Sequence, residues 1–490
     1  MATYLTLFLY TVLAELTRRI VLTLIHAYTG PLSKIPGPAL NKLTSLPWKL
    51  RITSGDFYYE LPKLFERYGD TVRVGPSMIL LKGKDAAQQL FVENVLSKTV
   101  VYEGFRSDPH HPDIFTERDK EAHKHRRRLL SHGFSISYLN NLEPAMMDCV
   151  DAFQQFLEGK CEQGGGTAQV DMFSNLANAT ADMLTATVFG ESWNLTKTNN
   201  THLKEIFTRQ LKTMLVHAHF PFLKYLPFVP NPADPEITRR LDGVLAKRRA
   251  LDKKDVKKDL LQMLIDTKEK YPKEYLEGHI KSDMQLFMIA GTDTSSVTLT
   301  FCLLLLVNNP LKLARLVEEL DEAFPSRDDP ITFEKTNSLP YLNAVLNESM
   351  RAMPVAIAFG REATEDIVVN GYELPRNLIP SKPQTLVTVN LAELGRDPAY
   401  WPDPELFIPE RWLAPYKGHE VDRKATLPFS AGPRNCIGMQ FAMRELRLLL
   451  AMVVRKFDLT LVPNQSHELR LYLVPVFVSR QYLVEVKVRD

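Results

Sequence analysis

The sequence predicts a mainly helical protein with small β-sheets. Most of its long segments repeat apolar residues with the spacing of an amphipathic helix. Short runs of the β type occur at residues 71–81, 366–374, 385–391 and 482–488. One further stretch, residues 283–310, is long and apolar enough to form a helix through the centre of a large core.

The composition is that of a large protein with nearly balanced charge. The chain has 490 residues and a formal net charge of +2 at pH 7, so nucleic acid is not an expected partner. The four cysteines are far apart and include no C-x-x-C pair. This spacing argues against a zinc ribbon, a dithiol redox motif and a secreted disulfide framework.

The N-terminal residues 1–28 are strongly apolar. Glu15, Arg18 and Arg19 interrupt the apolar run, and charges inside a membrane span are costly unless their side chains snorkel. We predict a membrane anchor that either spans poorly or lies in the interface, with an ordinary core helix as the alternative. A secretory signal is disfavoured, because the basic pair follows the first apolar run and no small-residue cleavage site comes after it.

Prolines dominate the next segment. Residues 29–40 contain Pro31, Pro36 and Pro38, which keep the backbone extended and stop a helix. We predict a stiff hinge that orients the rest of the chain against a membrane. Residues 41–490 contain no second linker, and we expect them to form one domain.

Residues 283–310 carry polar residues at the middle of the predicted helix, among them Gly291, Asp293 and Thr294. An ionised Asp at mid-bilayer costs about 2.5–3.5 kcal/mol, so a helix buried in a protein core fits better than a membrane span. Glycine inside a helix costs roughly 1 kcal/mol against alanine, so we expect Gly291 to make room for a group that approaches the backbone. The alternative is a kink in which hydroxyl groups bond back to the helix.

Two charged motifs gain meaning only together. Glu348 and Arg351 are three residues apart and therefore share one helix face. Arg411 follows in the segment FIPERW. If the three side chains are buried together, they form an ion-pair network rather than a surface pair.

Cys436 is surrounded by residues that build tight turns, namely Gly432, Pro433 and Gly438, with Arg434 nearby. A buried structural cysteine, a nucleophile and a metal thiolate all remain possible for a lone thiol. One thiolate cannot hold a bare metal ion, so a metal would arrive already chelated. A haem iron meets this condition, with cysteine as its single protein ligand.

Four motifs in one chain resemble the cytochrome P450 superfamily of haem-thiolate monooxygenases. The similarity extends over nearly the whole chain, including the anchor and the hinge, and residues 124–135 look most like fungal secondary-metabolism members. The cysteine signature is matched by Phe429, Gly432, Arg434, Cys436 and Gly438. The E-x-x-R motif is matched by Glu348 and Arg351, and the oxygen-activation motif by residues 290–295. The F-x-P-E-R-F segment is matched by Phe407, Pro409, Glu410 and Arg411.

The resemblance implies a haem-binding role for several residues. Cys436 would be the proximal thiolate on the iron of haem b (iron protoporphyrin IX), with Phe429 packed beside the sulfur and the haem. By similarity, the residues that meet the haem propionates are His123, Arg127 and Arg361, and Arg434 serves the same charge. Lys124, Arg126 and Arg128 could meet an acidic reductase.

The resemblance also assigns the polar helix and the ion-pair network. Thr294 would hydrogen-bond the bound oxygen, and Asp293 would relay protons through waters. Glu348, Arg351 and Arg411 would fix the haem-binding core without taking part in the chemistry. A hydrophobic substrate would be enclosed by five segments, residues 105–115, 217–222, 284–288, 355–359 and 473–477.

The implied enzyme inserts one oxygen atom from molecular oxygen into a hydrophobic small molecule. It would take electrons from NADPH through an NADPH-cytochrome P450 reductase, with residues 41–490 as the haem-thiolate catalytic domain on the cytosolic side of the endoplasmic reticulum membrane. The alternatives are a haem-thiolate isomerase, dehydratase or peroxide-using enzyme, a non-enzymatic haem carrier or sensor, and a thiol hydrolase. The sequence departs from the family at Asn377, where the usual glycine is replaced and the segment is longer, so the strand register nearby is uncertain.

Overall fold

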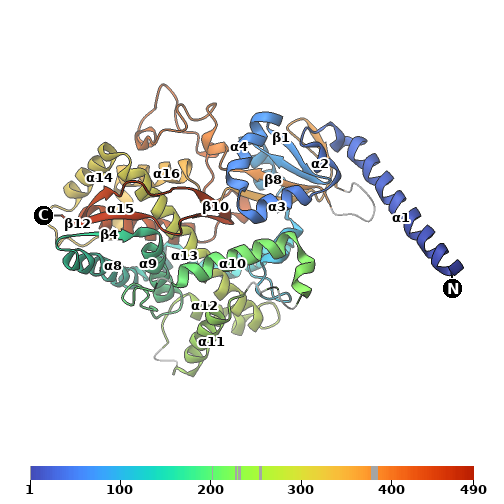
Figure 1. Cartoon of the computed structure of the whole chain (residues 1–490). Helices are drawn as coiled ribbons and strands as arrows, with labels where there is room; N and C mark the ends of the chain where they lie inside the picture. Colours follow the sequence, from blue (N-terminus) through green and yellow to red (C-terminus); the bar gives the residue numbers. More distant parts are fainter. Residues whose placement is uncertain are drawn as a thin grey trace. The chain divides into compact units, whose positions relative to one another are not determined.

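The computed structural model describes residues 2–200, 202–226, 229, 233–252, 256–376 and 384–489. The chain forms two compact units, one of residues 1–99 and 358–390 and the other of residues 100–357 and 391–490. Figure 1 labels their elements. The protein is mainly helical with small sheets, which confirms the predicted class.

The first unit is built on a five-stranded sheet. Its strand order is β1-β2-β8-β5-β3, with β2 and β8 parallel and the other neighbours antiparallel. The strands β6 and β7 form a separate hairpin through Asn370 and Gly371, both with positive φ, as an Asn-Gly turn favours. The elements are α1 (Ala2–Tyr28), α2 (Ala39–Leu43), α3 (Leu46–Ser54), α4 (Phe57–Tyr68), β1 (Thr71–Gly75), β2 (Met78–Leu81), α5 (Lys84–Gln88), β3 (Ser97–Lys98), β5 (Ala358–Glu362), β6 (Ile367–Val369), β7 (Tyr372–Leu374) and β8 (Leu386–Asn390).

The helix α1 extends away from this sheet in Figure 1. Its apolar side chains are mostly exposed, and Glu15 forms ion pairs with Arg18 and Arg19 halfway along it. After α1, the N–H of Arg73 in β1 donates to the carbonyl oxygen of Pro36 at 2.7 Å. The proline segment is therefore attached to the sheet rather than free of it. The segment around Asn377 lies outside the described residues.

The second unit contains most of the helices. A short 3-10 helix, η3 (Val100–Phe105), begins it. The α-helices are α6 (Lys120–Leu130), α7 (Ile136–Asn140), α8 (Glu143–Gln163), α9 (Met172–Val188), α10 (His202–His219), α11 (Pro235–Ala250), α12 (Leu260–Lys270), α13 (Glu277–Val307), α14 (Pro310–Ala323), α15 (Phe333–Ser338), α16 (Pro340–Ala352) and α17 (Met439–Lys456).

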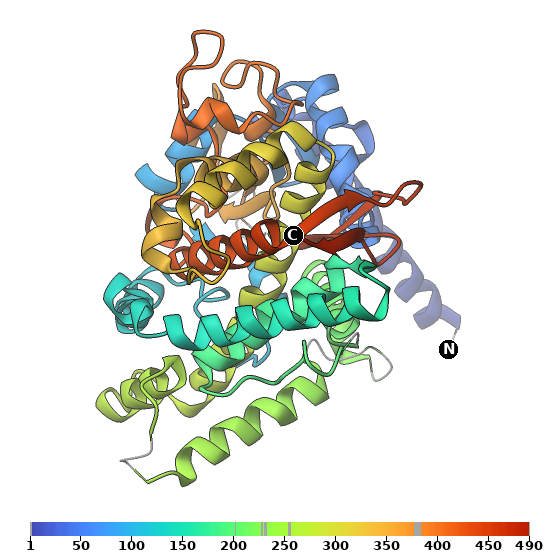
Figure 2. The same ribbon diagram turned by 90° about the vertical axis from the view of Figure 1, so that its left-hand side faces the viewer.

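Two small sheets complete the second unit. Strand β12 (Leu483–Val488) pairs antiparallel with both β4 (Thr167–Asp171) and β9 (Phe457–Leu461), and β10 (Leu469–Tyr472) pairs with β11 (Val474–Phe477). Figure 2 shows α17, in red, leading directly into the red strands. Most of the second half of α17 is buried.

The helix α13 is the predicted long central helix, and most of its residues are buried. Among the described residues it is the one helix that is long and apolar enough to cross a membrane, and its apolar window is mostly buried inside the protein. The expectation for Gly291 is confirmed, and the group that approaches is a side chain of a neighbouring helix. A side chain at Gly291 would come within 2.6 Å of Leu184 Cδ1 in α9, so the glycine makes room for helix packing.

Candidate active site

Cys436 lies in a tight loop directly before α17. Gly432 has a φ of 71°, a left-handed conformation that suits glycine, and it begins a short 3-10 turn. The N–H of Cys436 donates to the carbonyl oxygen of Phe429 at 2.9 Å, which closes the loop. The N–H of Gly438 donates to the Cys436 sulfur just ahead of the first turn of α17. N–H groups at the start of a helix favour a thiolate there.

The Cys436 thiol is accessible although protein atoms crowd around it. Cys436 is the exposed member of the four free cysteines, and Cys149, Cys161 and Cys302 are buried. Burial nevertheless raises the pKa of Cys436, while the Gly438 N–H and the Arg127 charge act in the opposite direction. Of the four cysteines, Cys436 is therefore the one that a ligand can reach from outside.

Arg127 connects α6 to this loop. Its Nη1 donates to the backbone oxygen of Asn435 at 2.6 Å and its Nη2 donates to Asn435 Oδ1 at 2.5 Å. The positive charge therefore sits one residue from the cysteine. His123, four residues earlier on the same helix face, is buried.

Arg434 makes a second contact between the cysteine loop and the segment that precedes α6. Its guanidinium donates to the backbone oxygens of Glu117 and Arg118 at 3.0 and 2.9 Å. The loop that precedes α6 is thereby fixed to the cysteine loop. The predicted contacts of Arg127 and Arg434 with haem propionates stay predictions.

One face of α13 is accessible although the helix is otherwise buried. Ala290 is exposed and Thr294, one turn later on the same face, is half-buried. The hydroxyl of Thr294 donates to the backbone oxygen of Ala290 at 2.7 Å. This stretch is partly accessible, and its hydroxyl group is bonded back to the helix.

Asp293 points to a different side of α13 and is not a lone acid. Its Oδ1 forms a short ion pair with the ammonium group of Lys204 in α10, and both side chains are buried. The Lys204 ammonium also lies 4.4 Å from the centre of the Phe173 ring. The sequence analysis did not identify Lys204, although a lysine on the apolar face of a helix is a signal that it has a buried partner.

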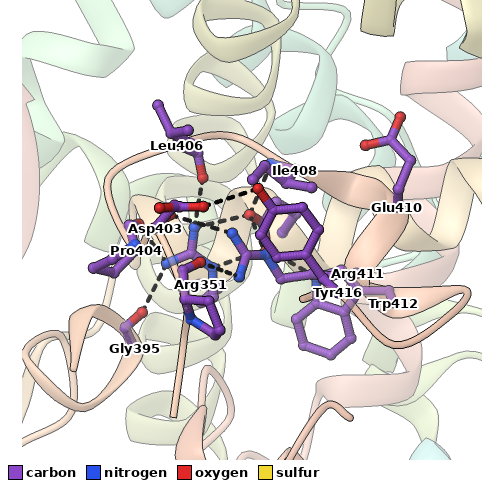
Figure 3. Close-up of polar contacts among 12 residues, drawn as sticks. Arg351, Gly395, Asp403, Pro404, Leu406, Ile408, Glu410, Arg411, Trp412 and Tyr416 are labelled. Carbon is purple, nitrogen blue, oxygen red and sulfur yellow. Dashed lines mark hydrogen bonds and ion pairs between the residues drawn. The ribbon is translucent and has the colours of Figure 1, made fainter. Parts of the chain in front are cut away.

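Glu348, Arg351 and Arg411 are all buried. Figure 3 shows the polar contacts around Arg351 and Arg411. Arg351 donates to both carboxylate oxygens of Glu348 at 2.8 Å, and Arg411 Nε lies 3.2 Å from Glu348 Oε1. The remaining donors of Arg351 reach the backbone oxygens of Gly395, Pro404 and Leu406. The network therefore ties α16 to the irregular segment that precedes the cysteine loop.

Two predicted residues have other surroundings. Arg361 lies in β5 of the first unit, where its Nη1 donates to the Gly360 oxygen at 2.9 Å and its guanidinium covers the Phe91 ring at 4.6 Å. Arg126 is buried and pairs with Glu117, so the expectation that it meets a reductase is wrong. Lys124 and Arg128 are exposed.

The residues fit a cofactor that brings its own metal ligands. Within the described residues, no group of three or more His, Cys, Asp or Glu side chains could hold a metal ion. The site instead offers one accessible sulfur with N–H groups and a guanidinium around it. This arrangement fits the class of haem-thiolate proteins, in which a single cysteine ligates the iron of a porphyrin.

Comparison with known proteins gives the family. Residues 36–488 match the family model "Cytochrome P450". The chain is 31% identical to the cytochrome P450 monooxygenase acrD of Aspergillus aculeatus over 466 residues, covering 93% of this chain and 91% of that protein. It is 30% identical to the cytochrome P450 monooxygenase LUC2 of a Fusarium species, covering 96% and 91%. It is 29% identical to the trichothecene C-15 hydroxylase of Fusarium sporotrichioides, covering 93% of each chain.

The chain belongs to the cytochrome P450 family. It is a haem-thiolate monooxygenase, and the family implies a haem iron as its cofactor.

Proposed function

We propose that Cys436 is the proximal ligand of the iron in haem b. The observation that carries this proposal is that Cys436 is the exposed cysteine, with the Gly438 N–H and the Arg127 charge beside its sulfur. A bound haem supplies the iron that activates molecular oxygen. The chain's own groups would hold it, with Phe429 beside the sulfur.

The other site residues take supporting roles in this proposal. Arg127, Arg434, His123 and Arg361 are the candidates that neutralise the haem propionates, because arginine matches a carboxylate by bidentate hydrogen bonds. The Thr294 hydroxyl, on the accessible face of α13, would exchange its hydrogen bond to the Ala290 oxygen for one to the reacting oxygen. The buried Glu348 network would hold the cysteine-loop region in shape.

We further propose a hydrophobic small molecule of fungal secondary metabolism as the substrate. An aromatic cluster supports an apolar pocket, because the rings of Tyr102, Phe105 and Phe115 lie within 5.1–6.2 Å of one another. The helix α10 packs so tightly on this region that a side chain at Gly104 would overlap the backbone of Ala218. One similar protein is named as a hydroxylase of a trichothecene.

NADPH, through an NADPH-cytochrome P450 reductase, is the proposed source of electrons, and the endoplasmic reticulum membrane is the proposed location. The exposed apolar side chains of α1 support a membrane anchor, with the catalytic domain in the cytosol. Deleting residues 1–28 should move the protein from the membrane fraction to the supernatant. Retention of the shortened protein on membranes would place the attachment elsewhere.

Carbon monoxide difference spectroscopy of the reduced protein tests the proposed ligand. We expect the shifted thiolate band in the wild type and in Cys161→Ala, whose cysteine is buried away from the site. Cys436→Ala should lose the band. A preparation that stays colourless after addition of hemin would favour a thiol hydrolase instead.

The reaction itself is tested by co-expression with a reductase in cells that make candidate metabolites. Under labelled molecular oxygen, mass spectrometry should find one labelled oxygen atom in the product. A product without labelled oxygen would favour a haem-thiolate isomerase or dehydratase.

A further inference from the structure

The second unit contains a cavity that shares no residue with the candidate active site. Its volume is about 420 Å³, which is in the range of small-molecule sites. Its walls come from α8, from α9 and the loop after it, and from the segment before α12. Among the described residues, its lining includes none from the cysteine loop, from the accessible stretch of α13 or from the five proposed substrate segments. The cavity is therefore a separate place for a ligand.

Small side chains leave this space open between α8 and α9. Ala145, Cys149 and Ala152 are four and three residues apart, so they share one face of α8, and all three line the cavity. Ala186 of α9 lines it as well. Burial raises the pKa of the Cys149 thiol to about 12, so this thiol carries no charge. Together these four side chains form an uncharged and weakly polar wall.

A buried carboxylate holds the first rim of the cavity, residues 190–197, in place. Asp182 Oδ1 accepts the N–H of Leu195 at 2.8 Å and the hydroxyl of Ser192 at 3.1 Å. Its Oδ2 accepts the N–H of Thr196 at 2.8 Å. The rim is thus formed before a ligand arrives, which lowers the entropic cost of binding.

The second rim, residues 257–259, is held in a similar way. Arg248 of α11 forms a buried ion pair with Asp259, and the Lys257 ammonium donates to the carbonyl oxygen of Gly190 in the first rim. A side chain at Gly190 would overlap both Asp259 and Arg248. The glycine therefore lets the two rims meet.

Both rims bring lysine side chains to the cavity. Lys197 belongs to the first rim, and Lys257 and Lys258 belong to the second. All three are exposed. Neither Lys197 nor Lys258 has an ion-pair partner among the residues that the structure describes. Two ammonium groups are therefore available to a ligand.

Most acidic side chains of the lining are already occupied. Asp182 and Asp259 hold the two rims, and Glu191 pairs with Lys247 at 3.0 Å. Asp148 of α8 is the remaining acid, and in the described part of the chain its carboxylate has no ion-pair partner. The free charges are thus two ammonium groups and one carboxylate, which favours an anionic ligand.

We propose that this cavity is a second ligand site, which binds a small organic carboxylate. The apolar body of the ligand packs against the alanine face of α8, and its charge is directed to Lys197 and Lys258. An ammonium group pairs with a carboxylate as a point charge, so it tolerates carboxylates of different shapes. Because the site shares no residue with the candidate active site, the inference does not rest on the proposed function.

Benzoate and benzamide are suitable probes, because they have nearly the same shape and only benzoate is charged. Hydrogen exchange of the full-length protein with its cofactor, followed by mass spectrometry, locates their binding. We expect millimolar benzoate to slow the exchange of residues 190–197 and 257–259, and benzamide to leave it unchanged. Equal protection by both probes, or protection of residues 105–115 in place of the two rims, would overturn the proposal.

The double variant Lys197→Met/Lys258→Met tests the charge requirement. It should bind benzoate roughly tenfold more weakly, since each exposed ion pair contributes little. Lys270→Met/Lys273→Met is the matched control, because it removes two exposed lysines that do not line the cavity. It should bind as the wild type does. Unchanged affinity in the first variant, or equal loss in both, would refute the site.

Ala152→Leu tests the apolar wall without a change of charge. The larger side chain fills part of the cavity and should lower the affinity for benzoate several-fold. If Ala152→Leu binds benzoate as tightly as the wild type, the ligand lies outside the cavity and the proposal is wrong.

Discussion

Arg127 is the residue that links the charge of α6 to the chemistry of the Cys436 sulfur. It makes two hydrogen bonds to Asn435 and its charge favours the thiolate. We expect Arg127→Met to lose both effects and to purify with several-fold less haem, although the fold is retained. The haem content per protein, determined as the pyridine haemochrome, measures this loss.

Arg128→Met is the matched control, because Arg128 is exposed on the next position of the same helix. It removes one positive charge without touching the cysteine loop, so it should keep the haem content of the wild type. Equal haem loss in both variants would show that overall charge matters rather than the contact with Asn435.

Lys204 is expected to be important for stability as well. Lys204→Met leaves the buried carboxylate of Asp293 without its partner, and breaking a buried pair from one side typically costs about 3–5 kcal/mol. The double variant Lys204→Met/Asp293→Asn removes the unpaired charge and should recover most of this loss. Urea unfolding gives the free energy of unfolding of the single and the double variant. Equal values for the two would show that the unpaired charge does not destabilise the protein.

Some of these residues could be predicted from the sequence and others could not. The i, i+3 spacing of Glu348 and Arg351 places both on one helix face, so their pairing follows from local geometry. The contact of Lys204 with Asp293 joins residues 89 positions apart, and that of Arg127 with Asn435 joins residues 308 apart. Such contacts depend on how helices pack, which periodicity does not specify.

At the scale of elements, the segment before α6 is attached to α13 by one buried carboxylate. The N–H of Ile114 donates to Asp283 Oδ1 at 3.0 Å, and the Tyr275 hydroxyl donates to Asp283 Oδ2 at 2.6 Å. All three residues are buried. Because Phe115 of the aromatic cluster follows Ile114, this attachment also positions the proposed apolar pocket.

Tyr275→Phe tests this attachment. The variant removes a hydrogen bond to a buried carboxyl group, which is typically worth about 1.5–3 kcal/mol when the acceptor is charged. We expect faster amide hydrogen exchange in residues 112–117 and a weaker substrate-induced spectral shift, with the carbon monoxide band unchanged. Tyr271→Phe is the control. Unchanged exchange in residues 112–117 would mean that other contacts hold the segment.

The positions of helices and strands were predicted more reliably than the contacts that their individual residues make. The strands at residues 71–81 and 385–391 form where the β-branched runs indicate, and α13 is the long buried helix. The role of Gly291 as a place of close approach was predicted correctly, and the group that needs its space is Leu184 in α9. A glycine in a helix signals a close approach, but the sequence does not say which group approaches.

At the scale of the whole molecule, the buried Glu445 makes stability depend on pH. Its folded-state pKa is raised to about 8 from 4.5, so between these values the folded protein keeps a proton that the unfolded chain releases. The free energy of unfolding should therefore fall as the pH rises through this window. Glu445→Gln should flatten the decline between pH 4.5 and about pH 8, as measured by urea unfolding. An equally steep decline in the variant would assign it to other groups.

At the scale of the whole molecule, one buried side chain also fixes the path of the chain after α1. Arg73 is buried, and its guanidinium donates to the carbonyl oxygens of Ala27 and Leu32 at 3.0 and 3.1 Å and to that of Pro76 at 2.7 Å. The end of α1 and the proline segment are thus held against β1, which gives the predicted stiff hinge a physical basis in addition to its prolines.

Arg73→Met should release this hinge, because it leaves several buried carbonyl oxygens without donors, at about 1–3 kcal/mol each. We expect rapid proteolytic cleavage within residues 29–40 of the variant, whereas the wild type should resist. Arg51→Met is the control, since Arg51 pairs with Glu60 at the surface of the same unit and should leave cleavage unchanged. If Arg73→Met resists cleavage as well as the wild type, the prolines alone keep the hinge rigid, and the direction of α1 does not depend on the arginine.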